Sequence, residues 1–323
     1  MTNRYPATLA SQREAGFAVV TALLIVAVVA TVAAFLALGQ QVWLRQAQNL
    51  ADRAQADAVR GGAVEWAAII LTLDARDNST DDLTQTWAQV LPPLPAEGGF
   101  VTGKIIDVQG RFNLNNLLQQ ENPSADDLAL FQRLLQNLEL PAELADSLVD
   151  WMDSNSTTQP NGAEDIDYLA SDPPHRAANR ELQNLEELGQ VKGFNAEVMN
   201  KLRPLITVLP EATAININTA SAELLQAMFA DLSLSEAEDL VGKREDEPFT
   251  QADDLKKHLP PDAALPKVRY DVRSAYFEVS VATLFGRLQR RSHAMLHRPT
   301  NAPVEILWQQ QQLVVPESSD DTS

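Results

Sequence analysis

The sequence contains no cysteine and only four histidines among its 323 residues. Without cysteine, the chain can form no disulfide, no thiolate metal site and no thiol nucleophile. The histidines are scattered, at positions His175, His258, His293 and His297. The sequence also has no phosphate-binding glycine loop and no serine in a nucleophile-elbow motif. These absences argue against an enzyme, and we expect no catalytic residues.

Basic residues are scarce as well, since 25 Lys and Arg stand against 44 Asp and Glu, giving a formal net charge of −19. A chain this acidic repels the phosphate backbone of nucleic acids, so non-specific nucleic-acid binding is unfavourable. The length is sufficient for more than one folding unit.

One long stretch lacks charge altogether. The run from Phe17 to Leu38 reads FAVVTALLIVAVVATVAAFLAL, and Thr21 and Thr31 are its polar members. At about 1.5 Å per residue, a helix of this length just spans a hydrocarbon core of roughly 30 Å. The run is too long for the apolar part of an ordinary signal peptide, and no small-x-small cleavage motif follows it. It therefore predicts a transmembrane helix.

The leader before this run, residues 1–16, is polar and carries Arg4 and Arg13. Positive charge on this side predicts that the leader faces the cytoplasm and that the chain from about residue 40 onward lies outside. A plain single-pass anchor would have the same features. In a Gram-negative cell, the bulk of the chain would then be periplasmic.

The helical pattern continues beyond the membrane segment to about Leu73. Apolar residues recur there at helical spacing, at Val59, Ala63, Trp66, Ala67 and Ile70. This spacing predicts one long helix whose second half packs on a globular head. Gly61 and Gly62 favour a bend in it, because glycine weakens a helix interior.

In the rest of the chain, the spacing of the apolar residues changes twice, from strand-like to helical and back to strand-like. Residues 100–108 alternate as in a strand, and residues 118 to about 270 predict short helices. Ser235 with Glu238, and Thr250 with Asp253, fit the capping-box pattern at helix starts. Strand-like alternation returns at 277–285, and 288–296 and 304–313 are further candidate strands. The sequence thus predicts an α+β fold in which an all-helical unit interrupts a small antiparallel sheet.

We divide the chain accordingly into six segments. They are a leader (1–16), a transmembrane helix (17–38), the first part of the head (39–117), an inserted helical domain (118–272), the C-terminal strands of the head (273–314) and an acidic tail (315–323). The polar, acidic composition of the tail predicts disorder.

Several motifs together resemble a known family. A polar leader ending in Gly16, followed by Phe17 and a membrane-length helix, resembles the prepilin-peptidase signal of type IV pilins and pseudopilins. Further matching segments are GRFNLNNL at 110–117, VDWMD at 149–153, GAED at 162–165 with Tyr168, and ININ followed by Thr219 and Ala220 at 215–220. In this order and spacing, the chain is similar to the type II secretion system protein K family of minor pseudopilins.

The resemblance implies a pilin-like fold interrupted by an α-domain with helix-hairpin-helix-like (SAM-like) units. It implies an inner-membrane protein with a periplasmic bulk, cleaved after Gly16 by prepilin peptidase and methylated on the new Phe17 amine. The implied partners are the minor pseudopilins I and J, in a ternary complex, and minor pseudopilin H. The implied role is to initiate or cap the periplasmic pseudopilus at its tip, for export of folded proteins across the outer membrane.

Thr21 departs from the pilin pattern, because it is the fifth residue counted from Phe17 and other pilins carry glutamate there. A carboxylate at that depth is costly in hydrocarbon unless it is paired. Its partner in a pilus is the α-amino group of the adjacent subunit. A subunit without this carboxylate cannot satisfy a neighbour above it, so Thr21 favours a position at the tip. The alternative is that Thr21 is merely a tolerated small residue.

The densest acidic cluster lies between Asp150 and Asp167 and holds five carboxylates without a basic residue. Oxygen-rich loops of this kind suit a hard cation, most plausibly calcium, and the resemblance to a calcium-binding K protein supports this. The candidate ligands are Asp150, Asp153, Asn155, Glu164, Asp165 and Asp167. Thr158 occupies the place of the invariant glycine of a helix-loop-helix calcium site, so the match to that motif fails. The alternative is a solvated acidic loop.

A second function class stays open. The segment after Ile217, together with Glu247–Leu255, resembles helix-hairpin-helix modules of DNA-binding proteins, in which a glycine hairpin offers N–H groups to phosphate. The connector 229–234 contains no glycine, whereas Val191–Phe194 includes Gly193 but follows two glutamates. The alternative function is therefore a membrane-anchored periplasmic DNA-binding protein, while we expect these modules to serve protein contacts and no nucleic acid.

Overall fold

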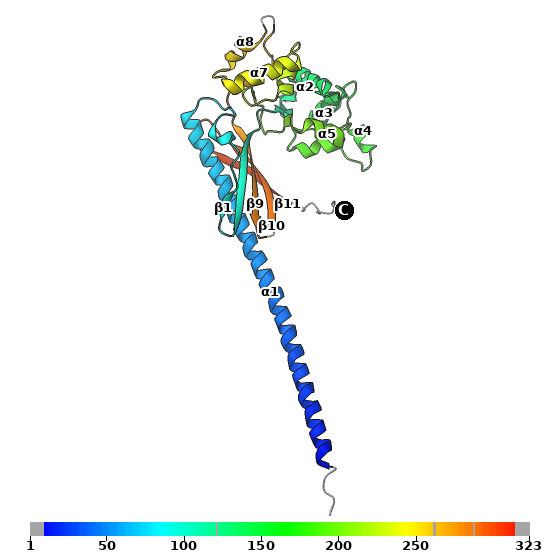
Figure 1. Ribbon diagram of the computed structural model, residues 1–323. Helices are drawn as coiled ribbons and strands as arrows, with labels where there is room; N and C mark the ends of the chain where they lie inside the picture. Colours follow the sequence, from blue (N-terminus) through cyan, green and yellow to red (C-terminus); the bar gives the residue numbers. More distant parts are fainter. Residues whose placement is uncertain (1–9, 121, 261–262, 287, 314–323) are drawn as a thin grey trace, which may run out of the picture.

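The computed structural model describes residues 10–120, 122–260, 263–286 and 288–313. One long helix carries a five-stranded sheet on its C-terminal part, and a cluster of short helices lies beyond the end of that sheet (Figure 1). The predicted α+β architecture, with its long apolar helix and small antiparallel sheet, is confirmed. The predicted leader cleavage site lies within the long helix, whereas the acidic tail lies outside the described residues.

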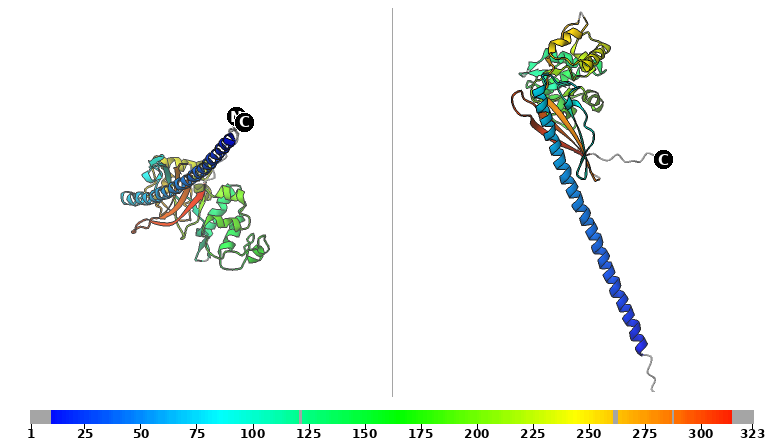
Figure 2. Two further views of the ribbon diagram at one scale, coloured as in Figure 1. Left: turned by 90° about the horizontal axis from the view of Figure 1, so that it is seen from below. Right: turned by 60° about the vertical axis from the view of Figure 1, so that its left-hand side comes forward.

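Helix α1, Ala10–Asp77, is 68 residues long, which corresponds to about 100 Å at 1.5 Å per residue. From Phe17 to Leu50 its side chains are almost all exposed, so the rod projects from the head without support (Figure 2). By length and composition, this helix could cross a membrane, with a mean hydropathy of 2.9 in its most apolar window. It stays helical through Gly61 and Gly62, so the glycine pair does not interrupt it.

The sheet has the strand order β1-β2-β9-β10-β11, and every neighbouring pair is antiparallel. Its strands are β1 (Leu94–Ala96), β2 (Gly99–Asp107), β9 (Tyr276–Phe285), β10 (Leu288–His297) and β11 (Glu305–Leu313). The strands predicted from alternation are present within one residue at each end. Strand β2 pairs with β9, although the chain between them passes through the inserted helices. The head therefore closes across a long insertion.

The first core lies between α1 and the sheet. Val64, Ala67 and Leu71 recur on one side of α1 and are buried. Alternate residues of β9 meet them, because successive side chains of a strand point to opposite faces. These are Phe277, Val279 and Val281. Helix η1 (Thr86–Ala88) adds Trp87, whose ring meets the edge of Phe277 at 5.3 Å between centroids.

The inserted unit contains short elements throughout. They are η2 (Leu114–Leu117), α2 (Ala125–Asn137), α3 (Leu144–Met152), α4 (Asp165–Leu169), η3 (Leu185–Gln190), α5 (Ala196–Leu202), α6 (Ala222–Met228), α7 (Leu234–Asp246), η4 (Ala252–Asp254) and α8 (Leu255–His258). Three small two-stranded pairs connect them: β3 (Phe112–Asn113) with β6 (Ile206–Thr207), β4 (Leu118–Gln119) with β5 (Asn122–Pro123), and β7 (Ile215–Asn216) with β8 (Tyr270–Asp271). Its apolar core is separate from the first and also takes in Phe112, Leu114 and Leu117.

Buried asparagines hold the irregular segments of this unit. The side chain of Asn115 donates to the carbonyls of Leu182 and Leu209 at 3.0 and 2.9 Å, and its carbonyl accepts from the Leu182 N–H. Asn218 pairs in both directions with the backbone of Phe249. A buried backbone group outside helices and sheets needs such a partner. The asparagines of the two Asn-rich motifs are therefore structural.

Two predicted capping boxes are wrong in register. Helix α7 begins at Leu234, where the Ser233 and Glu236 side chains and backbone N–H groups pair reciprocally. The second box joins Gln251 and Asp254. Both lie near the predicted pairs, because several polar residues precede an acidic residue by three positions there. The apolar positions Ala237 and Leu240 decide which turn faces the core.

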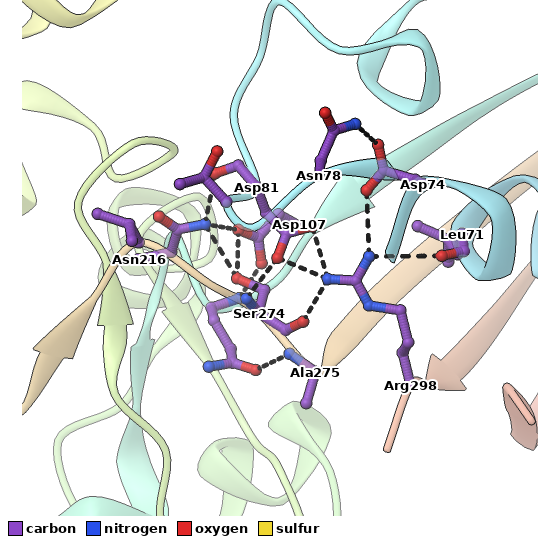
Figure 3. Close-up of polar contacts among 12 residues, drawn as sticks. Leu71, Asp74, Asn78, Asp81, Asp107, Asn216, Ser274, Ala275 and Arg298 are labelled. Atoms are coloured by element: carbon purple, nitrogen blue, oxygen red, sulfur yellow. Dashed lines mark hydrogen bonds and ion pairs between the residues drawn. The ribbon is translucent and has the colours of Figure 1, made fainter. Parts of the chain in front are cut away.

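A buried ion pair lies where the inserted unit meets the head (Figure 3). Arg298, just after β10, donates Nη2 to both carboxylate oxygens of Asp81 at 2.6 and 2.5 Å, and Nη1 to Asp74 at 3.2 Å. The side chains of Arg298 and Asp81 are 6% and 1% exposed. The guanidinium also lies 4.7 Å from the ring centroid of Phe277. Arg298 thus connects the end of α1 with the loop that follows it.

Asp107 extends this network into the inserted unit. Its Oδ2 accepts from Asn216 Nδ2, Thr219 Oγ1 and Ser274 Oγ at 2.8, 2.6 and 2.7 Å. Burial raises the pKa of Asp107, and these hydrogen bonds oppose that rise. Asn216 also donates to the carbonyl of Asp81 at 3.0 Å. The end of β2, the inserted unit and the loop after α1 therefore meet at one polar junction.

Replacing Arg298 with alanine should destabilise the chain by about 3–5 kcal/mol, because Asp81 and Asp74 would remain buried without their cation. Arg203→Ala is the matched control, since Arg203 pairs with Glu186 at 3.1 Å on the surface. There we expect a loss of about 0–1 kcal/mol. Chemical unfolding of the full chain in detergent, followed by circular dichroism, measures both. Equal losses in the two variants would show that the buried pair has no special role.

Candidate functional site

The acidic loop between α3 and α4 begins on a helix. Asp150 lies in the last turn of α3, where the apolar residues Leu148, Val149 and Trp151 anchor the helix in the core. The Asp150 side chain is itself buried, and both its oxygens accept from the Gln159 N–H at 3.2 and 3.0 Å. A Cβ at position 162 would collide with this carboxylate, so the loop requires Gly162.

Two further carboxylates of this loop are buried with Asp150. Asp153 and Glu164 are 1% and 6% exposed. Asp153 Oδ2 and Glu164 Oε1 have no hydrogen-bond partner. Burial, with the charges of neighbouring carboxylates, raises the pKa of Asp150 to about 6 and that of Glu164 to about 7. Uncompensated negative charge and unpartnered oxygens are therefore concentrated here, which is what a bound cation would relieve.

The other predicted ligands have different partners. Asn155 is exposed, and its Oδ1 accepts from the Thr157 N–H at 2.6 Å. Asp165 accepts from the Ala177 N–H and pairs with Arg176 at 3.3 Å. Asp167 accepts from the Glu164 N–H at the start of α4. The buried, electrostatically coupled set is thus Asp150, Asp153 and Glu164. In the described ranges, no three His, Asp or Glu side chains are arranged as a ready-made metal site.

The predicted processing site lies in the unsupported part of α1. Phe17 is 73% exposed and follows Gly16 within the helix. The Thr21 hydroxyl lies one turn further on and donates to the backbone carbonyls of Phe17 and Ala18, at 3.1 and 2.9 Å. Its hydrogen-bonding capacity as a donor is therefore used within its own helix.

The helix-hairpin-helix-like segments use their cations internally. Gly193 has a φ of +90° in its tight turn, as such a hairpin requires. The preceding Lys192, however, donates its Nζ to the Gly162 carbonyl at 3.1 Å, within the acidic loop. In α7, Arg244 is buried and donates to the Ile217 carbonyl at 2.5 Å, while Lys243 donates to the His258 carbonyl. These three cations therefore have hydrogen-bond partners within the chain itself.

The sequence pattern did not predict two surface features. An apolar cleft of about 400 Å³ lies between α1 and the sheet, beside Trp66 and Leu94. Trp66, Ile69 and Leu73 are 43–55% exposed and form an apolar stripe along α1. A second cleft, of about 720 Å³, lies between the inserted unit and the start of β11. The pattern of apolar residues predicted a packed helix but did not separate its buried side from this exposed one.

Comparison with known proteins gives one consistent family. Residues 110–211 and 215–273 match two family models, both described as type II secretion system protein K. The type II secretion system protein K of Pseudomonas aeruginosa is 34% identical over 305 residues, covering 90% of this chain and 91% of the relative. The protein K of Aeromonas hydrophila is 29% identical, covering 89% and 94%.

A solved structure shares the fold. It is the crystal structure of the GspK–GspI–GspJ complex from the type 2 secretion system of enterotoxigenic Escherichia coli, and the similar chain is matched with a TM-score of 0.68. The match has 24% sequence identity and covers 83% of this chain and all of that one. The observed fold, a sheet on a long helix with an inserted helical unit, agrees with these similarities. The chain belongs to the type II secretion system protein K family.

Proposed function

We propose that this chain is a minor pseudopilin at the tip of the periplasmic pseudopilus, where it initiates or caps assembly for export of folded proteins across the outer membrane. The observation that carries the proposal is the shape of α1. Its N-terminal part is a bare apolar rod, and a head packs only on its C-terminal part. A rod of this kind suits bundling with similar helices. The role needs no catalysis, and we expect none.

The tip position is supported by Thr21. The Thr21 side chain is uncharged, and its hydroxyl donates to the Phe17 and Ala18 carbonyls of its own helix. It therefore offers no carboxylate to a neighbouring subunit. A subunit above would have to bury its α-amino group in hydrocarbon without a carboxylate partner. Such a neighbour is disfavoured, which leaves this chain uppermost.

The same proposal includes placement and processing. The apolar segment anchors the chain in the inner membrane, with the head in the periplasm. Prepilin peptidase cleaves between Gly16 and Phe17, and the new Phe17 amine is methylated. Exposure of Phe17 on the bare helix is compatible with access by an enzyme.

The proposed partners are minor pseudopilins I and J, in a ternary complex, with minor pseudopilin H next to them. Two observations support protein partners of this kind. The similar solved chain comes from a complex of GspK with GspI and GspJ. The stripe of Trp66, Ile69 and Leu73 also leaves apolar surface open on α1, beside an apolar cleft. Exposed apolar patches of this kind mark interaction sites.

DNA binding is the weaker alternative. Lys192, Lys243 and Arg244 are engaged with backbone carbonyls of the chain itself. The net charge of −19 adds repulsion from phosphate. The helix-hairpin-helix-like segments therefore serve as scaffold.

We also propose that the acidic loop holds calcium with a structural role. Asp150, Asp153 and Glu164 would supply oxygen ligands, because they are buried together and two of their oxygens have no partner. Asn155, Asp165 and Asp167 are the other candidates, and each already accepts a hydrogen bond within the chain. The cation would neutralise carboxylates that otherwise repel one another.

The partner proposal predicts binding to an I–J pair and not to DNA. The full chain in detergent should retain I and J on an affinity column at physiological salt. Its Kd for a 20-base-pair duplex should be weaker than about 10⁻⁴ M, the weak end of the range for non-specific binding. A single Trp66→Asp substitution should weaken retention, because it places a charge in the apolar stripe, whereas Glu65→Gln serves as the neighbouring control. Micromolar DNA binding without retention of I–J would overturn the proposal.

The processing proposal predicts a mature N-terminus at methylated Phe17. Mass spectrometry of the intact protein, purified from cells containing prepilin peptidase, measures this directly. Gly16→Leu should leave the leader in place, whereas Ala15→Leu, one residue earlier, tests whether bulk alone prevents cleavage. A wild-type chain that begins at Met1 would instead identify a simple anchor.

The calcium proposal predicts that a chelator lowers the melting temperature of the full chain. At a calcium concentration ten times the Kd, binding contributes about 1.4 kcal/mol, and extracellular sites have a Kd of about 10⁻⁴ to 10⁻³ M. The variant with Asp150→Asn and Glu164→Gln should no longer respond to chelation. The control with Glu245→Gln and Asp246→Asn, both on the exposed surface of α7, should respond as the wild type does. Identical melting with and without chelator in the wild type would remove the site.

A further inference from the structure

The two edges of the five-stranded sheet differ in their protection. Strand β1 is three residues long and contains Pro95. Strand β11 has nine residues, and from Ile306 to Leu313 it contains no charged residue, proline or glycine. Natural proteins protect exposed edges with short strands, proline and charge, because a long bare edge pairs with other chains. The β1 edge has the short length and the proline, whereas β11 has only the charge of Glu305 at its start.

The outer side of β11 is open in the part of the chain that the structure describes. Strand β11 pairs with β10 from Glu305 to Leu313, and the sheet order ends there. In an antiparallel strand, successive residues direct their N–H and C=O groups alternately to the two sides. Half of the β11 backbone groups therefore point away from β10. Strand β11 stands at the opposite end of the sheet order from β1, and Gln311 on it donates to Asp57 of α1 at 3.2 Å.

A cleft adjoins the start of this edge. A bulge at Leu307 interrupts the pairing, and Leu307 and Trp308 line the cleft of about 720 Å³ together with Met295 of β10. Val208 and Leu209 of the inserted unit form part of the opposite wall. The Trp308 side chain is 40% exposed. The edge thus offers backbone pairing along its length and, at one end, a recess with both apolar and polar walls.

The size of the edge indicates what kind of chain covers it. Nine residues span about 30 Å, and at the roughly 10 Å depth of a sheet this gives about 300 Å² per partner. A specific interface needs about 1,000 Å² in total, so strand pairing alone is insufficient. The cleft must also be filled. A folded domain with its own edge strand meets this need better than a short peptide.

Two other occupants fit less well. The acidic tail contains proline, glutamate and two aspartates, which are poor strand formers, and it follows the end of β11, whereas the cleft adjoins the start of that strand. A second copy of the chain would bring together two molecules of net charge −19, which repel each other.

We propose that β11 is the docking edge for an edge strand of a neighbouring minor pseudopilin head, from the I–J pair, which extends the sheet by one strand and covers the cleft beside Trp308. This inference rests on the proposed function. It adds the means of recognition, which is main-chain pairing at an unprotected edge.

Photo-crosslinking tests the contact. Benzoylphenylalanine is placed at Gln310 on β11 or at Glu245 on the exposed surface of α7 of the full chain, which is then mixed with I and J. We expect crosslinks to I or J from position 310 in at least tenfold higher yield than from 245. Hydrogen exchange should also slow at least tenfold at alternate amides of residues 305–313 when I–J is bound. Retention of I–J without either effect overturns the inference and leaves the proposed function intact.

Proline substitutions separate pairing from simple proximity. Gln309 and Gln310 are successive residues, so their N–H groups point to opposite sides of β11. One of the substitutions Gln309→Pro and Gln310→Pro therefore removes an N–H that points away from β10, and leaves the hydrogen bonds between β10 and β11 intact. That variant should melt like the wild type but bind I–J at least tenfold more weakly. Unchanged binding in both variants overturns the inference, as does crosslinking between two copies of the chain or protection of 305–313 that is lost when residues 314–323 are deleted. Failure of I–J to bind the wild type overturns both proposals together.

Discussion

The buried ion pair between Arg298 and Asp81, with the hydrogen bonds of Asp107 beside it, holds α1, the sheet and the inserted unit in one arrangement. The chain leaves the head after β2, builds the helical unit and returns to form β9, so both connections cross the same boundary. At that boundary, Arg298 reaches Asp81 and Asp74, and Asp107 reaches Asn216. A buried ion pair adds little net stability compared with apolar packing, but breaking it is costly. Its consequence is therefore orientation: Arg298 fixes the loop after α1 within the head, and the inserted unit cannot tilt on the head without withdrawing Asn216 and Thr219 from the buried Asp107 carboxylate.

A defined orientation matters because the two ends of the molecule present different surfaces. The apolar part of α1 suits helix bundling in a membrane or a fibre, and its Thr21 hydroxyl is satisfied internally. The head and inserted unit carry the exposed features, which are the α1 stripe, the two clefts and the β11 edge. These features lie on both sides of the polar junction. A partner that contacts the sheet and the inserted unit together would recognise only the arrangement that Arg298 and Asp107 hold.

Elements with a strong local period could be predicted from the sequence, and contacts between distant residues could not. Alternating residues placed β9 within one residue, and the uncharged run gave α1. Capping boxes were misplaced by one or two residues, since Ser233 and Ser235 both precede a glutamate by three positions. The acidic loop was found by composition, but its six candidate ligands differ in burial and in hydrogen-bond partners, because Asp165 and Asp167 serve the start of α4. The pair of Asp81 and Arg298 spans 217 positions and has no local signal.

The acidic loop and the open sheet edge are physically linked through Asp153. This residue belongs to the buried carboxylate set, and it also lines the cleft that Trp308 borders. Its Oδ2 atom has no hydrogen-bond partner, so the wall contains an unsatisfied buried acceptor. Under the two proposals, calcium would neutralise the wall of the recess that a neighbouring head covers, whereas the backbone groups of β11 would be unaffected. Loss of the ion should therefore weaken the part of the contact made by the inserted unit, while strand pairing along β11 persists. The metal would then adjust the affinity for the neighbouring head, and the β11 edge would define the register of strand pairing.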